Sequence, residues 1–230
     1  MNKDKIRQLR EERRKQENRR LILEAAERVI LQKGTSAMTM DDVAHEAGFS
    51  KATLYHYFGN KGEVVRELMA NYFEEVKREL QRIQTMKLGA GEKLKRSILF
   101  YLQFNQAKEN LSRMLMMDRH FMERMRILVA HGGKAVSESD RKFIDMVKLK
   151  RQEILERGAQ VLKEGMASGE FRKVDLAKAM TFLESALWGY CHARFWRERK
   201  YSLKEATELI HDFLLQGIGR KNQASKGDPR

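Results

Sequence analysis

The most constraining feature of this sequence is a pair of short helical patterns joined by a tight turn, within residues 39–61. Thr39 can cap the first helix, because its side-chain oxygen can accept a hydrogen bond from a backbone N–H of the first turn. Gly48 can adopt the left-handed conformation that stops this helix. Phe49 fills the space between the helices, and Ser50 caps the second one. The segment is therefore predicted to be a helix-turn-helix.

The second helix of this motif has an unusual outer surface. Only Leu54 and Phe58, four residues apart, are predicted to face the core. The side chains predicted to face outward are Lys51, Thr53, Tyr55, His56 and Tyr57. Two tyrosines, a histidine and a lysine turned to water are uncommon in a purely structural helix. The pattern indicates a recognition helix that enters a DNA groove; a helical hairpin with exposed aromatic side chains is the alternative.

The motif resembles the DNA-binding domain of the TetR family of transcriptional regulators over about residues 20–68. The matching residues are Thr39, Val43-Ala44, Ala47-Gly48-Phe49-Ser50, Leu54-Tyr55-His56-Tyr57-Phe58 and Lys61. Gly62 departs from the family pattern, in which an acidic or polar residue usually follows the lysine. The resemblance implies contacts to base edges from Lys51, Ala52, Thr53, Tyr55 and His56. It also implies phosphate contacts from Thr39, Ser50, Tyr57 and Lys61.

Helical spacing recurs along the whole chain, so the predicted fold is all-α with nine helices. The single proline, Pro229, lies in the tail and interrupts no helix of the body. Besides the two motif helices, the predicted helices cover about 19–33, 60–86, 92–109, 111–130, 138–169, 175–199 and 202–217. The predicted domains are a basic arm (1–18), a helix-turn-helix domain (19–65), a ligand-binding and dimerisation domain (66–217) and a disordered tail (218–230).

Positive charge is concentrated before the motif. The formal net charge of +14 favours polyanionic partners. Residues 1–20 hold nine basic and four acidic side chains, whereas residues 21–60 hold three basic and five acidic ones. The basic side chains of the arm are Lys3, Lys5, Arg7, Arg10, Arg13, Arg14, Lys15, Arg19 and Arg20. This arm either extends the first helix or lies along the DNA backbone, with entry into a minor groove as a further option. A solvated, frayed leader is the alternative.

The sequence gives no sign of an enzyme, a secreted protein or a membrane protein. A single cysteine, Cys191, excludes an internal disulfide and suits a reducing cytoplasm. There is no secretory signal and no run of about eighteen apolar residues that could span a membrane. His45 lacks the second histidine, four residues on, that a helical zinc site requires. His192 follows Cys191 directly, and adjacent helix positions point apart. We therefore expect no metal, no redox cofactor and no catalytic activity.

Two helices near the carboxy terminus are predicted to bury more than one face each. One stripe on 175–199 consists of Leu176, Met180, Leu183, Leu187 and Tyr190. Phe182, Trp188 and Cys191 lie outside that stripe, and the helix at 202–217 is similarly apolar. The family resemblance implies that these helices pair with their symmetry mates in a four-helix bundle. A homodimer with a two-fold axis would match a palindromic operator; a thick monomeric core is the alternative.

The middle of the chain is predicted to hold a small-molecule site, because methionine and aromatic side chains there offer adaptable apolar surface. The candidate ligand contacts are Phe100, Phe104, Met117, His120, Phe121, Phe143, Val147 and Lys150. Such a stripe can equally be ordinary core, and His120 can be a histidine satisfied within that core. The excess of basic over acidic residues in 62–230 favours an anionic amphipathic ligand such as a fatty acyl thioester, while a lipophilic or cationic drug stays open.

These observations predict a cytoplasmic, homodimeric, ligand-responsive transcriptional regulator. We interpret it as a repressor that is released from a palindromic operator when a small hydrophobic molecule binds the carboxy-terminal pocket. The competing interpretation is an architectural protein that binds DNA of any sequence. The sequence does not identify the inducer, the operator, or whether the ligand releases or promotes DNA binding.

Overall fold

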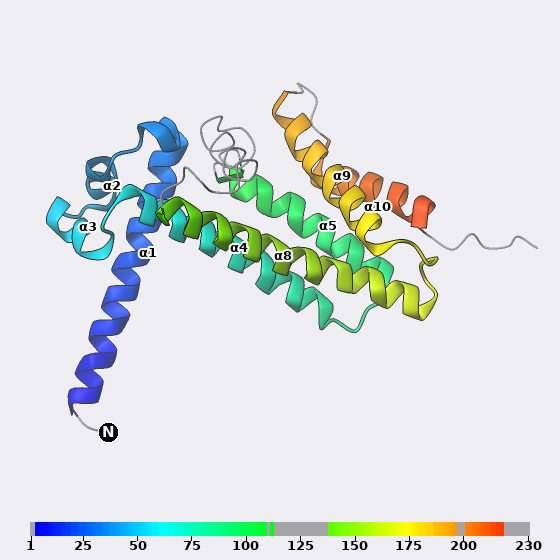
Figure 1. Ribbon diagram of the computed structural model, residues 1–230, viewed down its shortest axis with the longest axis horizontal. Coiled ribbons are helices and arrows are strands. Elements are labelled where there is room, and N and C mark those ends of the chain that lie inside the picture. The colour runs from blue at the N-terminus through cyan, green and yellow to red at the C-terminus, as the bar shows by residue number, and fades with distance from the viewer. Residues whose placement is uncertain (1–2, 110, 113–137, 197–200, 219–230) are drawn as a thin grey trace, which may run out of the picture. The chain divides into compact units, whose positions relative to one another are not determined.

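The computed structural model describes residues 3–109, 111–112, 138–196 and 201–218 (Figure 1). Eight α-helices form this part of the chain, and no helix in it is long and apolar enough to cross a membrane. The all-α prediction is confirmed. Residues 113–130 of the sixth predicted helix and the tail from 219 lie outside the described residues. The helices are α1 Lys3–Ala37, α2 Met40–Ala47, α3 Lys51–Tyr57, α4 Lys61–Gln84, α5 Ala90–Ala107, α8 Glu138–Ser168, α9 Leu176–Trp196 and α10 Leu203–Ile218.

The chain divides into two compact units. The first, termed the amino-terminal unit, comprises residues 1–72 and 108–148, and the second, the carboxy-terminal unit, comprises residues 73–107 and 149–230. The amino-terminal unit contains α1, α2 and α3, whereas α4 and α8 each contribute residues to both units. Each unit buries apolar side chains of its own, such as Ile22 in the first and Ile98 in the second.

Helix α1 is longer than the predicted range 19–33, and the structure agrees with the alternative in which the basic arm extends the first helix. It begins at Lys3 rather than near residue 19, so the basic arm continues the first helix. Residues 3–18 contain neither glycine nor proline and carry an i,i+4 pair, Arg7 Nε to Glu11 Oε1 at 3.5 Å, which favours helix. The predicted core residues of α1 are buried: Ile22, Ala25, Ala26, Val29 and Ile30. The helical backbone breaks at Gly34, where φ is +77°, as the sequence predicts.

The two motif helices have the caps that the sequence predicts. The Thr39 side chain accepts a hydrogen bond from the Asp42 N–H at 3.1 Å, and the Asp42 carboxylate accepts one from the Thr39 N–H at 3.1 Å. Gly48 ends α2 with φ at +71°, a conformation that other residues rarely adopt. Ser50 caps α3 by accepting from the Thr53 N–H at 3.1 Å. The helix-turn-helix prediction is confirmed.

Three further helix ends agree with the sequence. Ser202 accepts from the Glu205 N–H at 3.2 Å, and the Glu205 carboxylate accepts from the Ser202 N–H at 2.8 Å, which starts α10. Asn60 accepts from the Glu63 N–H at 3.0 Å and starts α4. Gly169, with φ at +81°, ends α8. These ends are predictable because each depends on neighbouring residues alone.

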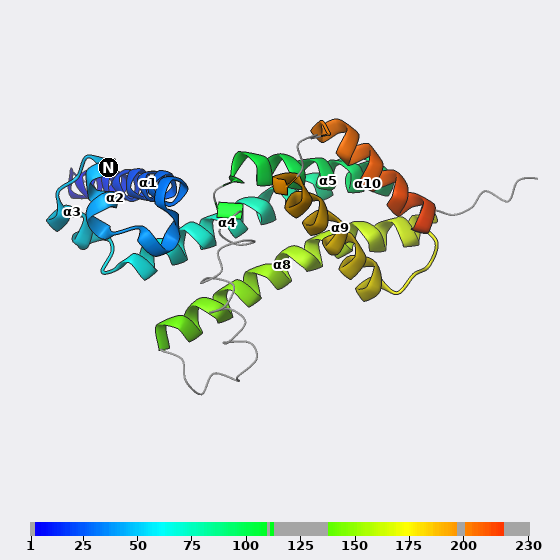
Figure 2. The same ribbon diagram turned by 90° about the horizontal axis from the view of Figure 1, so that it is seen from above.

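In the carboxy-terminal unit, α5 lies beside α10 in both views (Figures 1 and 2) and also contacts α9. The Glu170 carboxylate accepts hydrogen bonds from the backbone N–H groups of Ala90 and Gly91, both at 2.9 Å, and so caps α5 from the loop after α8. These bonds hold the pKa of Glu170 below its ordinary value. Lys93 pairs with Glu164 at 2.9 Å and joins α5 to α8. The unit is thus held together by contacts between segments far apart in sequence.

Candidate nucleic-acid interface

Helix α3 is anchored on one side and open on the other. Leu54 and Phe58 are fully buried beneath it, as predicted. Lys51, Ala52, Tyr55 and His56 are exposed, with 46% of Tyr55 accessible to solvent. A short helix is thereby fixed by its apolar side while its polar and aromatic side presents donors, acceptors and flat apolar surface.

Two residues predicted to face outward are only half-buried, because the protein itself engages them. The Thr53 hydroxyl lies 2.8 Å from that of Ser50, so Thr53 belongs partly to the helix cap. The Tyr57 hydroxyl accepts a hydrogen bond from the Asn18 amide at 2.9 Å. The freely exposed surface of α3 is therefore narrower than the sequence predicts, and Tyr57 also attaches α3 to α1.

Arg19 holds the carboxy-terminal end of α3. Its guanidinium pairs with Glu67 of α4, donates to the backbone carbonyl of Tyr57 at 3.1 Å and lies over the Phe58 ring at 4.4 Å. Its pKa is raised, mainly by the hydrogen bonds to Glu67. The sequence analysis counted Arg19 among the cations of the arm that attract DNA. The structure corrects this, because the Arg19 side chain joins α1 to α3 and α4. Its partners are distant in sequence, so spacing alone gave no signal of this role.

Lys61 has a structural role that the sequence analysis missed. Its ammonium donates to three carbonyl oxygens around the end of α1: those of Thr35 at 2.9 Å, Ser36 at 2.9 Å and Met38 at 3.0 Å. An ammonium has three N–H donors, so all of them are used within the chain. One sequence signal exists, because a cation in the first turn of a helix opposes the helix dipole and so needs another reason to be there. A phosphate would have to compete with these three bonds.

Lys51 is available to a ligand despite its ion pair. Its ammonium lies 2.8 Å from Asp41 Oδ1, and this contact raises the pKa of Lys51. Both side chains are more than half exposed, so solvent screens the ion pair and it opens easily. Asp41 therefore positions Lys51 in the free protein without preventing it from reaching an acceptor.

Two ion pairs attach α2 to α1 below the exposed face. Lys33 lies 2.6 Å from Asp42, and Arg28 lies 2.6 Å from Glu46. The Lys33 ammonium and the Thr39 hydrogen bonds together lower the pKa of Asp42 to about 2. The helix that precedes the recognition helix is thus fixed by its cap and by charge on the same carboxylate.

Residues 22–68 match the family model described as bacterial regulatory proteins, tetR family. Residues 22–68 therefore form a DNA-binding domain of the TetR type. It is 27% identical over 143 residues to the HTH-type transcriptional regulator YhgD of Bacillus subtilis, with 62% of this chain and 72% of YhgD covered. It is 26% identical over 168 residues to the HTH-type transcriptional repressor KstR2 of Mycolicibacterium smegmatis, with 73% of this chain and 74% of KstR2 covered.

The likeness in fold extends beyond the motif. The transcriptional regulator FadR of Bacillus subtilis, solved in complex with stearoyl-CoA, superposes with a TM-score of 0.68 at 22% identity. The superposition covers 86% of this chain and 98% of the FadR chain. The likeness of fold therefore includes the carboxy-terminal helices, although they contain no motif that the sequence alone reveals.

Some of the predicted ligand contacts belong to the part of the chain that the structure describes, and others do not. The rings of Phe100 and Phe104 lie 5.4 Å apart on successive turns of α5, and Phe104 is buried. On α8, Val147 is buried and Phe143 is half-buried. Three predicted contacts lie outside the described residues: Met117, His120 and Phe121. The assignment of all these positions to a ligand stays a prediction.

Lys150, the predicted polar contact for a ligand, is engaged by carboxylates. Its ammonium pairs with Glu74 of α4 and lies 3.8 Å from Glu153, which in turn pairs with Lys77 at 2.7 Å. The hydrogen bond to Glu74 raises the pKa of Lys150. An anionic ligand head group at Lys150 would therefore have to displace Glu74. Sequence spacing could not reveal this network, because α4 and α8 are far apart in sequence.

Helices α9 and α10 each bury some large apolar side chains and expose others; their pairing with a second copy stays a prediction. On α10, Ala206, Ile210 and Leu214 are buried, whereas Leu209 and Phe213 are 48% and 63% exposed. On α9, the exposed apolar side chains are Phe182 at 64% and Trp188 at 38%. Cys191 is buried, and this burial raises the pKa of its thiol to about 11.

Proposed function

We propose that this protein is a regulator of the TetR family and a homodimeric repressor of transcription. In this proposal it holds a palindromic operator through α3 and releases it when a small hydrophobic or amphipathic molecule binds among the carboxy-terminal helices. The observation that carries the proposal is the exposed side of α3, where Lys51, Ala52, Tyr55 and His56 lie over a fully buried Leu54. The relative KstR2 is named a transcriptional repressor, which supports repression rather than activation.

The chemistry of this exposed side suits the major groove. A lysine can donate to the O6 and N7 acceptors of guanine, while alanine and tyrosine can contact thymine methyl groups. His56 and Thr53 add hydrogen-bonding groups beside them. Phosphate contacts from Thr39, Ser50, Tyr57 and Lys61 would fix the register of α3, with Lys61 giving up some of its carbonyl bonds to do so.

Two copies of α3 are needed to read a palindrome, and the exposed apolar side chains of α9 and α10 supply a surface for pairing. Phe182, Trp188, Leu209 and Phe213 would leave water if these helices packed against their symmetry mates. Recognition helices about 34 Å apart would then fit successive major grooves on one side of the duplex. A two-fold axis in the protein accounts for the two-fold symmetry of the proposed operator.

Control by a small molecule requires two states of the dimer with different affinities for it. The buried apolar side chains of α5, including Leu102 and Phe104, suit a hydrophobic or amphipathic ligand. Stearoyl-CoA, the molecule in the FadR complex, is amphipathic and guides the first choice of probe. A ligand that bound both states equally would change nothing.

The proposal is tested by selecting duplexes from a random pool with the purified full chain. We expect enrichment of one palindromic sequence. Tyr55→Ala should cost about 1–3 kcal/mol of binding to that sequence and relax its base preference. Tyr201→Ala, which removes an exposed tyrosine before α10, is the matched control and should leave binding unchanged. Equal binding to all duplexes would indicate an architectural protein and overturn the repressor.

A further inference from the structure

We propose that the helical arm at the start of α1 binds the DNA backbone beside the half-site read by α3, through a row of three arginines. This row, termed the arm row, consists of Arg7, Arg10 and Arg14. The inference rests on the proposed function, because it adds a second contact surface for the same DNA. It concerns the phosphates that flank the half-site, which the exposed side of α3 does not reach.

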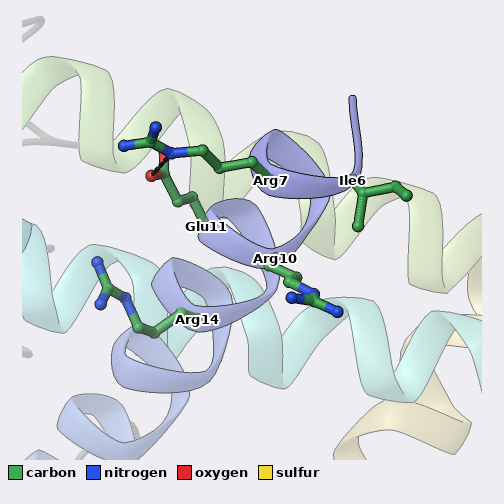
Figure 3. Close-up of a pocket in the computed structure, with 5 residues that line it drawn as sticks. All are labelled: Ile6, Arg7, Arg10, Glu11 and Arg14. Carbon is green, nitrogen blue, oxygen red and sulfur yellow. Dashed lines mark ion pairs between the residues drawn. The ribbon is translucent and has the colours of Figure 1, made fainter. Parts of the chain in front are cut away.

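The arm row occupies one face of a regular helix. At about 100° per residue, Arg7, Arg10 and Arg14 lie within about 60° of one another around the axis. Figure 3 shows their guanidinium groups fanned across this face, with Arg7 and Arg14 on one side and Arg10 on the other. Together with Ile6 and Glu11 they line a shallow hollow on α1. At a rise of about 1.5 Å per residue, the row spans about 10 Å along the helix.

The arm row is on the same face of α1 as a contact to the recognition helix. Asn18, one turn after Arg14 on this face, donates to the Tyr57 hydroxyl of α3 at 2.9 Å. Arg19 fixes the same end of α3 through the Tyr57 carbonyl. The side of α1 that bears the arm row is thus the side attached to α3, so the row and the recognition helix can meet one duplex together.

The arginines of the row are available, unlike those that follow them. Arg19 pairs with Glu67, and Arg20 pairs with Glu17 and Glu24. In contrast, Arg7 is 82% exposed and has only a 3.5 Å contact to Glu11.

Arg10 and Arg14 are exposed and have no carboxylate partner among the described residues. A guanidinium group can bind a phosphate with two parallel hydrogen bonds, and its planar shape reduces the side-chain entropy lost for each bond.

DNA is the partner that this row fits, because the motif itself cannot attract phosphates strongly. Residues 21–60, which include α2 and α3, contain three basic and five acidic side chains, so this segment has a net charge of −2. B-DNA carries one negative charge for about every 1.7 Å of its axis, so a row of about 10 Å lies against several phosphates at once. The arm row supplies the positive charge that the motif lacks.

The test compares two triple variants of the full chain on the selected palindrome with long flanks. The first, Arg7→Gln, Arg10→Gln and Arg14→Gln, removes the arm row. The matched control, Lys5→Gln, Arg13→Gln and Lys15→Gln, removes three cations from other faces of the same helix. For each, the affinity is measured over a series of salt concentrations, and hydroxyl-radical footprints show the protected phosphates.

The arm-row variant should flatten the dependence of log affinity on log salt by about 0.9 for each lost phosphate contact, and it should lose protection at both outer flanks. The control should keep most of the slope and the full footprint. Arginine-to-lysine changes at the three row positions keep the charges but not the paired hydrogen bonds, so they should restore most of the slope. Equal slopes in the two triple variants, or an unchanged footprint in the first, would overturn the arm-row proposal alone. Failure of the unaltered chain to select any duplex would overturn the proposed function as well.

Discussion

The helix-turn-helix (α2 and α3) and the apolar helices α9 and α10 are held in place by different kinds of interaction. Around α2 and α3, single side chains set each helix end: Thr39, Gly48 and Ser50 all act on residues within three or four positions. In α9 and α10, burial of Leu183 and Ile210 orders the helices, while Phe182 and Phe213 stay exposed. Because these hydrogen bonds are local, the ends of α2 and α3 can be predicted from the sequence. The role of α9 and α10 depends instead on what packs against their exposed apolar side chains.

The largest expected effect sharpens this comparison at the exposed apolar face. Phe213→Glu places a charge on the surface that we propose pairs two copies, so the chain should become monomeric. Loss of the second half-site contact should weaken binding to the palindrome by about 100-fold or more. Sedimentation and binding measurements check this. Lys204→Glu places a carboxylate at an exposed position on the opposite side of α10 from Phe213 and should leave the dimer intact. A dimeric Phe213→Glu chain would contradict the assigned interface.

The next effect separates structure from recognition within the amino-terminal unit. Lys61→Met removes three hydrogen bonds from an ammonium to backbone carbonyls and should lower the free energy of unfolding by about 1.5–3 kcal/mol. Lys51→Met removes only an exposed ion pair, so it should weaken DNA binding while the protein unfolds at nearly the same denaturant concentration. Denaturant unfolding of both variants measures the difference. If Lys61→Met unfolds like the unaltered chain, the structural role of Lys61 is wrong.

A third prediction concerns a glycine for which packing outweighs helix propensity. Replacing a glycine inside a helix by alanine ordinarily raises the free energy of unfolding, by up to about 1 kcal/mol. At Gly165 of α8, however, an added Cβ would lie 2.1 Å from Phe171 Cδ2, so Gly165→Ala should lower the free energy of unfolding by about 1–3 kcal/mol. Gly189→Ala in α9 meets nothing within 4 Å and should raise it. Thermal unfolding of the pair gives the signs; a stabilising change at Gly165 would contradict the packing described.

The smallest effect concerns pH and the cap of α2. The pKa of Asp42 falls from 3.8 to about 2 on folding, so its ionised form stabilises the folded state above about pH 4. This contribution is lost as the pH falls through the folded value. The stability difference between the unaltered chain and Asp42→Asn should therefore be largest near neutral pH and shrink between about pH 4 and pH 2. Unfolding measured at several pH values tests this, and a difference independent of pH would exclude the role of the charge.

The comparison also explains how much the sequence could reveal. The all-α fold and the ends of α2, α3 and α10 were predictable, because each cap is made by residues three positions apart. The start of α1 was predictable only as one of several alternatives, since the arm has none of the buried apolar residues from which a helix is recognised. The bonds of Arg19 to Glu67 join residues 48 positions apart, and no local pattern marks such a pair.

The candidate sites divide in the same way. Exposure of Lys51, Tyr55 and His56 followed from the position of Leu54 on a short helix. The engagement of Lys150 by Glu74 did not, because it depends on how α8 packs against α4. Sequence periodicity distinguishes a buried face from an exposed one, but it cannot tell a binding surface from core where several helices meet.

The central claim is that the exposed side of α3 enters successive major grooves, and tethered DNA cleavage tests it most directly. Ala52→Cys places a reactive thiol on that side, while Cys191 is buried with a pKa of about 11 and should escape labelling. An iron chelate attached at position 52 should cut the selected palindrome in two symmetric clusters about 34 Å apart. Cuts scattered evenly along the duplex, or no cuts in a complex that still forms, would contradict the claim.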